Sequence, residues 1–409
     1  MRTLIFLLLT LIMFASVAMA QDKKDKIEIG VQSTSLTLVH PDVSFDDTQV
    51  GIGGRVTYNF NRSIAAEAEI NFFPQKQFIL TADGNAIQAQ FGVKLGKRFE
   101  KFGLFAKVRP GFLSVNRVFS FIPGSQAPNG IPALNFKFER QAFFTIDTGG
   151  VLELYPSSRT VVRFEAGDTA IRHPPRFSQI FSPTPNVELL RSAKYNHNFQ
   201  FTAGVAFRLG DFPDEEPEVK ISGGGEEKIK RFEVGAQFTS LIVNPRSNFF
   251  SVTLPRRHAE PGFGARFTFN LTEVVAFEAE GNYYTREQFL SQGGHIFQGQ
   301  FGGKVGKRFD RWGLFGKARP GFVGFTRVLE FPGSVQPTVA RFVTKLYPSL
   351  DVGGVVEFYI SPRWMARFDI GDTLIRYDEN RFNVVLPPVI QRRETRHNLQ
   401  LSSGIAFRF

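Results

Sequence analysis

Histidine and charged side chains are the residues of this chain whose types could support chemistry. His197 and His397 occupy equivalent positions in the two halves of the chain, each just before the last predicted strand of its half. A histidine can activate a serine nucleophile when an acidic side chain orients it. The halves share no serine–histidine–acid spacing, and the other four histidines do not recur as a set. We therefore expect no catalytic residues, no metal site and no enzyme, with a rim-located lipid-modifying enzyme as an alternative.

A cofactor site is not predicted either. The segment GVKLGK at 92–97 superficially resembles a phosphate-binding loop. Its spacing differs from that of such loops, no serine or threonine follows the lysine, and no helical pattern follows. The chain contains no cysteine, which excludes disulfide bonds and thiolate metal sites.

Charged side chains form a second group, and they alternate with apolar ones. In 87–95, Phe91 and Leu95 fall on one face of an extended chain, whereas Gln88 and Lys94 fall on the other. Successive side chains of a β-strand point to opposite faces, so this period of two predicts strands. The charged residues that recur on the polar face in both halves are Glu67, Glu69, Lys94, Lys107, Arg109, Asp147, Glu153, Arg163, Glu165 and Arg208, with Glu278, Glu280, Lys304, Lys317, Arg319, Asp351, Glu357, Arg367, Asp369 and Arg408.

The chain repeats itself over most of its length. FGVKLGKRFEKFGLFAKVRPGF at 91–112 returns as FGGKVGKRFDRWGLFGKARPGF at 301–322. A repeat unit of about 180 residues is too long for a solenoid and predicts a duplicated domain. We expect a first barrel repeat at 27–210, a polar linker at 211–230 and a second barrel repeat at 231–409.

Strand number and connection length predict the architecture. In the first half, strands are expected near 27–37, 50–60, 63–72, 87–95, 103–115, 141–155, 159–168 and 199–209, and the second half repeats this set. Short connections alternate with long ones, which are expected near 38–49, 73–85, 116–140 and 173–195. This arrangement is typical of an all-β, antiparallel, up-and-down transmembrane barrel. Its apolar face would meet lipid, and the charged residues would form a network in the lumen.

The first twenty residues have the features of a secretory signal peptide. Arg2 precedes an apolar run, and Ala18-Met19-Ala20 offers a small-residue cleavage site. We expect cleavage near Ala20 and export to the bacterial outer membrane, which excludes nucleic acid as a physiological partner.

These features resemble the small outer-membrane β-barrels of the OmpA/OmpX-like family. The ending GIAFRF at 404–409 is similar to the C-terminal signal that the barrel assembly machinery recognises, with Phe407 and Phe409 as its aromatic residues. The resemblance implies an integral barrel that needs this machinery during biogenesis. Members of the family usually have one barrel per chain, so it leaves the arrangement of two copies open.

Two arrangements are compatible with the repeat. Each copy could close into an eight-stranded barrel, or all strands could form one sixteen-stranded barrel. The polar segment 211–230 is long for a periplasmic turn, which favours two barrels. The inward charges of one copy, five acidic and five basic, could neutralise one another in the narrow interior of an eight-stranded barrel.

Two local predictions accompany this fold. The aromatic residues Phe102, Tyr155, Trp312 and Tyr359 are near the short connections and would form an interface girdle. Pro110 and its counterpart Pro320 lie within predicted strands and indicate a bulge or bend.

Three functions remain open at this point. The leading one is a structural, envelope-integrity or surface-interaction role through the long extracellular loops, and a passive pore and the rim enzyme are the alternatives. Outer-membrane lipids and lipopolysaccharide are the expected partners, because basic residues cluster in the predicted loops and could bind anionic phosphates. They are Arg256, Arg257, Arg381, Arg392, Arg393 and Arg396.

Overall fold

The computed structural model describes residues 27–39, 46–74, 84–122, 135–179, 187–209, 230–244, 257–288, 294–330, 341–382 and 389–409. The elements formed by these residues are all β-strands. No helix in these ranges is long and apolar enough to cross a membrane. The predicted signal peptide and nearly all of the predicted linker lie outside the described residues.

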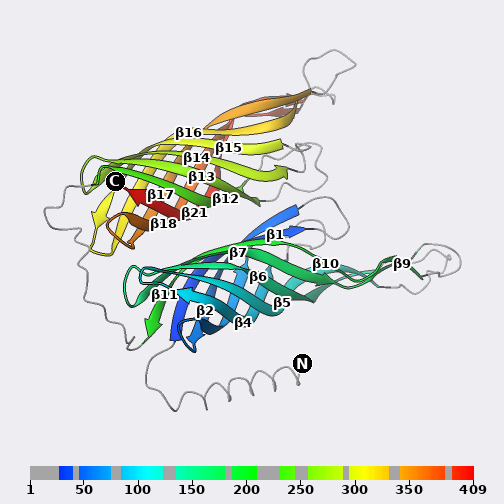
Figure 1. Cartoon of the computed structure of the whole chain (residues 1–409). Helices are drawn as coiled ribbons and strands as arrows, with labels where there is room; N and C mark the ends of the chain where they lie inside the picture. The colour runs from blue at the N-terminus through cyan, green and yellow to red at the C-terminus, as the bar shows by residue number, and fades with distance from the viewer. Residues whose placement is uncertain are drawn as a thin grey trace.

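The first half forms one closed antiparallel barrel (Figure 1). Its eight strands are β1 (Ile27–Val39), β2 (Asp46–Asn59), β3 (Ile64–Phe73), β4 (Ala86–Arg98), β5 (Phe102–Ile122), β6 (Asn135–Leu154), β7 (Thr160–His173) and β11 (Phe199–Leu209). From β1 to β7 each strand pairs with the next. The ring closes because β11 pairs with both β7 and β1.

The second half closes in the same way. Its strands are β12 (Phe232–Val243), β13 (His258–Asn270), β14 (Val275–Gln288), β15 (Gly294–Arg308), β16 (Trp312–Glu330), β17 (Arg341–Tyr359), β18 (Trp364–Tyr377) and β21 (Glu394–Arg408). Here β21 pairs with both β18 and β12. The prediction of two eight-stranded barrels, rather than one barrel of sixteen strands, is confirmed.

Burial is inverted relative to a water-soluble protein, as the membrane setting requires. In β3 the carboxylate-bearing Glu69 is 4% exposed, whereas the adjacent Ile70 is 55% exposed. The same alternation runs along β3 from Ile64 to Phe73. Charged side chains therefore point into the barrel and aliphatic ones point outward, toward lipid.

The prediction of a loop at 116–140 is wrong over its described residues, 116–122 and 135–140, which are strand. Strand β5 continues to Ile122 and pairs with β6, which begins at Asn135, and β16 and β17 pair in the same way in the second barrel. Five short strands also occur within predicted loops: β8 (Arg176–Gln179), β9 (Val187–Arg191), β10 (Lys194–Asn196), β19 (Asn380–Phe382) and β20 (Val389–Gln391).

The bulge predicted at Pro110 is also misplaced. The register between β4 and β5 is the same on both sides of this residue, because a missing N–H removes one ladder bond without inserting a residue. The irregularity instead lies further up the hairpin, between Val115 and Val118. There Arg117 has a φ of 55°, and its counterpart Arg327 has a φ of 52°. These values lie in the left-handed region, as expected for a bulged strand.

The two barrels lie side by side and point the same way (Figure 1). Three contacts between them join residues at equivalent positions of the two halves. Thr48 of β2 pairs with Ala259 of β13 near the long-loop ends. The Ser240 hydroxyl donates to that of Ser35 at 3.4 Å. Near the short turns, Phe164 and Phe368 stack with ring centroids 5.9 Å apart. Contacts between equivalent positions are typical of a two-fold related, isologous interface.

The serine contact predicts a cross-link. With Ser35→Cys and Ser240→Cys combined, we expect a disulfide on mild oxidation, because the hydroxyls are close and the native chain has no competing cysteine. Non-reducing electrophoresis of the denatured chain would detect it as a mobility shift. Val31→Cys combined with Ser240→Cys is the matched control, since Val31 lies on the same face of β1 but is exposed. A cross-link equally efficient in both pairs would contradict this packing.

Candidate functional site: the ionic layer inside each barrel

The period of two places the predicted charged residues on the inner face of each barrel. In the first barrel they come from β3 to β7 and from β11, and all except Arg208 are fully buried. Arg208 lies near the short-turn end, where its Nε contacts Glu28 at 3.1 Å. The structure thus brings the predicted set together as one network.

Arg109 is the centre of the upper part of this network. Its guanidinium donates from Nη1 to Glu69 at 2.6 Å and from Nη2 to Glu165 at 2.7 Å. It also donates from Nε and Nη2 to Asp147, at 2.9 and 2.6 Å. Lys107 contacts Asp147 at 2.8 Å and donates to Glu165 at 2.7 Å. Charge-assisted bonds of this kind are what a buried ion requires.

Arg163 links this upper part to a lower one. Its Nε lies 2.5 Å from Glu165, and its two Nη atoms both donate to Glu67. Lys94 lies 3.4 Å from Glu67 and donates to Glu153. Four of the predicted basic residues, Lys94, Lys107, Arg109 and Arg163, therefore share the five predicted acidic partners rather than forming separate pairs. Arg208 joins through Glu28, which Arg98 also contacts.

Tyr155 closes the lower part, although it was predicted in the interface girdle. It lies just beyond the end of β6, is buried, and donates its hydroxyl to Glu153 at 2.9 Å. Burial and the neighbouring carboxylate raise the pKa of this hydroxyl, so it stays protonated as a donor. Tyr359 makes the same bond to Glu357 at 3.0 Å. The girdle prediction is therefore wrong for both tyrosines.

Phe102 and Trp312, by contrast, do face outward at the short turns. Phe102 stacks on Phe99 with ring centroids 4.6 Å apart, and Trp312 stacks on Phe309 at 4.2 Å. At the C-terminus, Phe407 packs edge-on against Trp364. These aromatic rings occupy the level at which an interface girdle would lie.

Several members of the network were not predicted from the sequence. Arg55 lies 3.1 Å from Glu165, and Arg98 lies 3.4 Å from Glu28. Their counterparts in the second barrel are Arg266 with Asp369 and Arg308 with Glu233. The recurrence of these residues in both halves was a signal that could have found them.

The second barrel differs from the first at one important position. Asp369 stands where the first barrel has Glu165, and its side chain is one methylene shorter. Lys317 is 3.8 Å from Asp369, whereas Lys107 is 2.7 Å from Glu165. The second network is therefore looser at this point.

Above the ionic layer, the lumen of each barrel is filled by an apolar cluster. In the first barrel the buried members are Leu36, Phe73, Ala86, Leu113, Val115, Val118 and Ile171. In the second they are Leu241, Val243, Tyr284, Ile296, Val323, Phe325, Ile375 and Tyr377. Both clusters lie toward the long-loop ends, so each lumen is filled at two successive levels.

Each recurring histidine is paired with an aspartate near the long-loop rim. His197 Nδ1 lies 2.6 Å from Asp168, and His397 Nδ1 lies 2.6 Å from Asp372. The first histidine side chain is 76% exposed. The adjacent hydroxyl of Thr169 points into the barrel and donates to Gln200. Among the described residues, no group of three or more acidic or histidine side chains could hold a metal.

The basic residues predicted to contact lipopolysaccharide are only partly described. Arg256 lies outside the described residues. Arg393 lies 3.6 Å from Asp378, and Arg396 lies 3.0 Å from Glu394, so both have acidic neighbours.

Removing the central cation should destabilise the first barrel strongly. Arg109→Met leaves Glu69, Asp147 and Glu165 short of a shared partner, and breaking a buried ion pair costs about 3–5 kcal/mol. Unfolding in urea, followed by heat-modifiable mobility on electrophoresis, would measure the loss. Lys101→Met is the control, because its ion pair with Glu100 is exposed and should contribute about 0–1 kcal/mol. Equal effects of the two substitutions would contradict the assigned role of Arg109.

The Glu165 and Asp369 difference allows a reciprocal test. Glu165→Asp should lengthen the contacts to Lys107 and Arg55 and lower stability by roughly 1–3 kcal/mol, the range for hydrogen bonds to charged groups. Asp369→Glu should shorten the corresponding contacts and raise the stability of the second barrel. Urea midpoints of both variants would show shifts of opposite sign, and shifts of the same sign would contradict the geometry.

Comparison with known proteins agrees with this geometry. A family model described as "outer membrane protein beta-barrel domain" matches residues 6–211, half of the chain. A search of curated proteins gives no match. The solved structures that resemble it include Neisserial surface protein A, at 7% identity over 46% of this chain and 99% of that one, with a TM-score of 0.31. Ail of Yersinia pestis resembles it at 13% identity over 45% of this chain and 99% of that one, with a TM-score of 0.28. A Pseudomonas aeruginosa FadL homologue resembles it at 11% identity over 95% of this chain and 91% of that one, also with a TM-score of 0.28. The family match makes the chain a member of the outer membrane protein β-barrel domain family.

Proposed function

We propose that this protein is a pair of closed outer-membrane barrels with a structural and surface-presenting role, and that neither lumen conducts solutes. The observation that carries the proposal is the ion-paired interior. The interior of an eight-stranded barrel is just wide enough for side chains to fill it. Here those side chains bond to one another, and the guanidinium groups of Arg109 and Arg319 have no exposed surface.

A pore would need a continuous path of water, and two features oppose one. The ionic layer is held by several charge-assisted bonds per cation, so opening it would separate buried charges at a high cost in free energy. The apolar cluster above it replaces polar partners with hydrocarbon, and in the first barrel all its buried members are apolar. A passive pore is therefore the less favoured function.

Surface presentation is supported by the long hairpins. Strands β5 and β16 are 21 and 19 residues long, whereas β3 has 10 residues, so the hairpins extend beyond their neighbours. At each bulge an arginine lies over an aromatic ring, Arg117 over Phe138 at 5.6 Å and Arg327 over Phe342 at 5.2 Å. These contacts stiffen the hairpins as supports for the outer loops. Lipopolysaccharide phosphates are the ligands that basic loop residues would bind.

We propose no catalytic role for the two His–Asp pairs. The hydroxyls that directly follow the two aspartates along the chain, those of Thr169 and Thr373, point into the lumen and donate to Gln200 and Gln400. A nucleophile held in this way cannot reach lipid at the rim. The barrel assembly machinery remains the proposed partner during biogenesis, through Phe407 and Phe409.

Conductance measurements test the closed lumen. After insertion of the purified chain into planar bilayers, we expect a flat current trace, because the side chains leave no water-filled path. Insertion would be verified by protease protection of the same sample, and a general porin would serve as the positive control. Reproducible step openings from the inserted protein would refute the proposal.

A further inference from the structure

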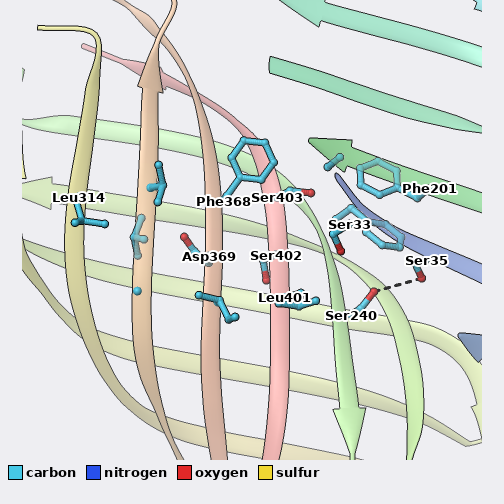
Figure 2. Close-up of a pocket in the computed structure, with 16 residues that line it drawn as sticks. Ser33, Ser35, Phe201, Ser240, Leu314, Phe368, Asp369, Leu401, Ser402 and Ser403 are labelled. Carbon is cyan, nitrogen blue, oxygen red and sulfur yellow. Dashed lines mark hydrogen bonds between the residues drawn. The ribbon is translucent and has the colours of Figure 1, made fainter. Parts of the chain in front are cut away.

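A crevice of about 300 Å³ lies between the two barrels (Figure 2). One wall is made by outward-facing residues of β1 and β11, including Ser33 and Phe201. The other is made by β12, β16, β17, β18 and β21, including Leu314 and Leu401. Ser35 and Ser240, which bond to each other at 3.4 Å, bridge the two walls. The lining is mostly apolar, although both walls belong to charged barrels.

The crevice lies at the depth of the membrane hydrocarbon. Leu314 is the third residue of β16, counted from the short turn, and Ser35 is the ninth residue of β1, counted from the same side. The crevice therefore extends from the short-turn side toward the middle of the barrels. Short turns are periplasmic in such barrels, so this side faces the periplasmic leaflet.

A sequence difference between the halves explains why the crevice exists. Ser33 and Phe238 are equivalent positions. Phe238 packs face to face on Phe201 with ring centroids 4.1 Å apart, which fills the interface on one side of the two-fold axis. The equivalent pair on the other side of the axis is Ser33 with Leu401. These two side chains together occupy less volume than the two stacked phenylalanine rings. The space left by Ser33 is part of the crevice.

A glycine enlarges the opposite wall. Gly354 faces outward from β17, and a Cβ added there would meet only the Cγ2 methyl of Ile370 and a backbone oxygen, at 3.9 and 4.0 Å. Its counterpart Gly150 in the first barrel would have nothing within 4 Å, because that face is open. A larger side chain fits at both positions, but only at 354 would it enter the crevice.

We propose that this crevice binds one acyl chain of a phospholipid from the periplasmic leaflet. The surrounding hydrocarbon offers no water, and an unfilled apolar void loses the dispersion contacts of its lining. An acyl chain supplies those contacts with no polar group to desolvate. The site goes beyond the proposed function of the barrels and does not depend on whether their lumens conduct.

Photolabelling tests the site in the full chain. The protein is reconstituted in detergent-free vesicles of phosphatidylethanolamine and phosphatidylglycerol, with a trace of phosphatidylcholine that carries a diazirine on one acyl chain. After irradiation, peptide mass spectrometry compares adducts at Phe238, which is 7% exposed, with adducts at Val31, which is 70% exposed. We expect labelling at both positions, because a bound chain reaches Phe238 while bulk lipid reaches Val31.

Two variants fill the crevice from opposite walls. Ser33→Phe and Gly354→Leu should each abolish the Phe238 adducts while labelling of the open lipid face persists. Their matched controls, Val31→Phe and Gly150→Leu, add the same side chains to the open surface and should leave the Phe238 adducts in place. Because Val31 itself is replaced in Val31→Phe, adducts at Ile29 report labelling of the open lipid face in that variant. Folding of each variant is checked by heat-modifiable mobility. A disulfide that forms when Ser35→Cys and Ser240→Cys are added to each variant shows that both walls are present.

Two results would overturn the proposal. The first is an unlabelled Phe238 in the wild-type chain under conditions that label Val31. The second is Phe238 labelling that persists in both filled variants. Neither result depends on conductance, so a failure here is distinguishable from a failure of the proposed function.

Discussion

The structure depends on the requirement that backbone hydrogen bonds be complete in a medium without water. An open sheet edge in hydrocarbon would leave unpaired N–H and C=O groups, so each set of eight strands closes on itself. Closure at this strand number leaves an interior only wide enough for side chains. Charged residues that the strand period directs inward must therefore be neutralised by other charged residues. Arg109 donates hydrogen bonds to three carboxylates for this reason, and Tyr155 donates one to the carboxylate of Glu153.

Much of this arrangement was predictable from the period of two and from the repeat. Alternation along 87–95 predicted which face of β4 carries Lys94, and recurrence in the second half distinguished charges of the lumen from charges of the loops. The same rule could have corrected the girdle prediction. Glu153 and Tyr155 are two positions apart and therefore share a face, so assigning the glutamate to the lumen also assigns the tyrosine there.

The partners within the lumen were not predictable, because they depend on the stagger between strands. Glu67 and Arg163 are bonded across the interior although 96 positions separate them. Nothing in the sequence of either strand specifies that these two side chains lie at the same level along the barrel axis. The hairpin bulge at Arg117 was also not predictable, since the proline nearby was a stronger sequence signal for a break. The packing of one barrel on the other depends on outward-facing residues such as Ser35. In the sequence, Ser35 looks like any small residue on the lipid-facing side of a strand, so its place in the interface could not be predicted.

The contacts of Ser35 with Ser240 and of Phe164 with Phe368 have a genetic consequence. In an assembly of two separate identical chains, every substitution on an isologous surface appears twice, so both sides of the axis must change together. A single chain that carries both surfaces is free of that constraint. Ser33 and Phe238 have diverged in this way, so the interface is filled on one side of the two-fold axis and contains the crevice on the other. Covalent linkage thus permits an asymmetry that two freely associating, identical subunits could not encode.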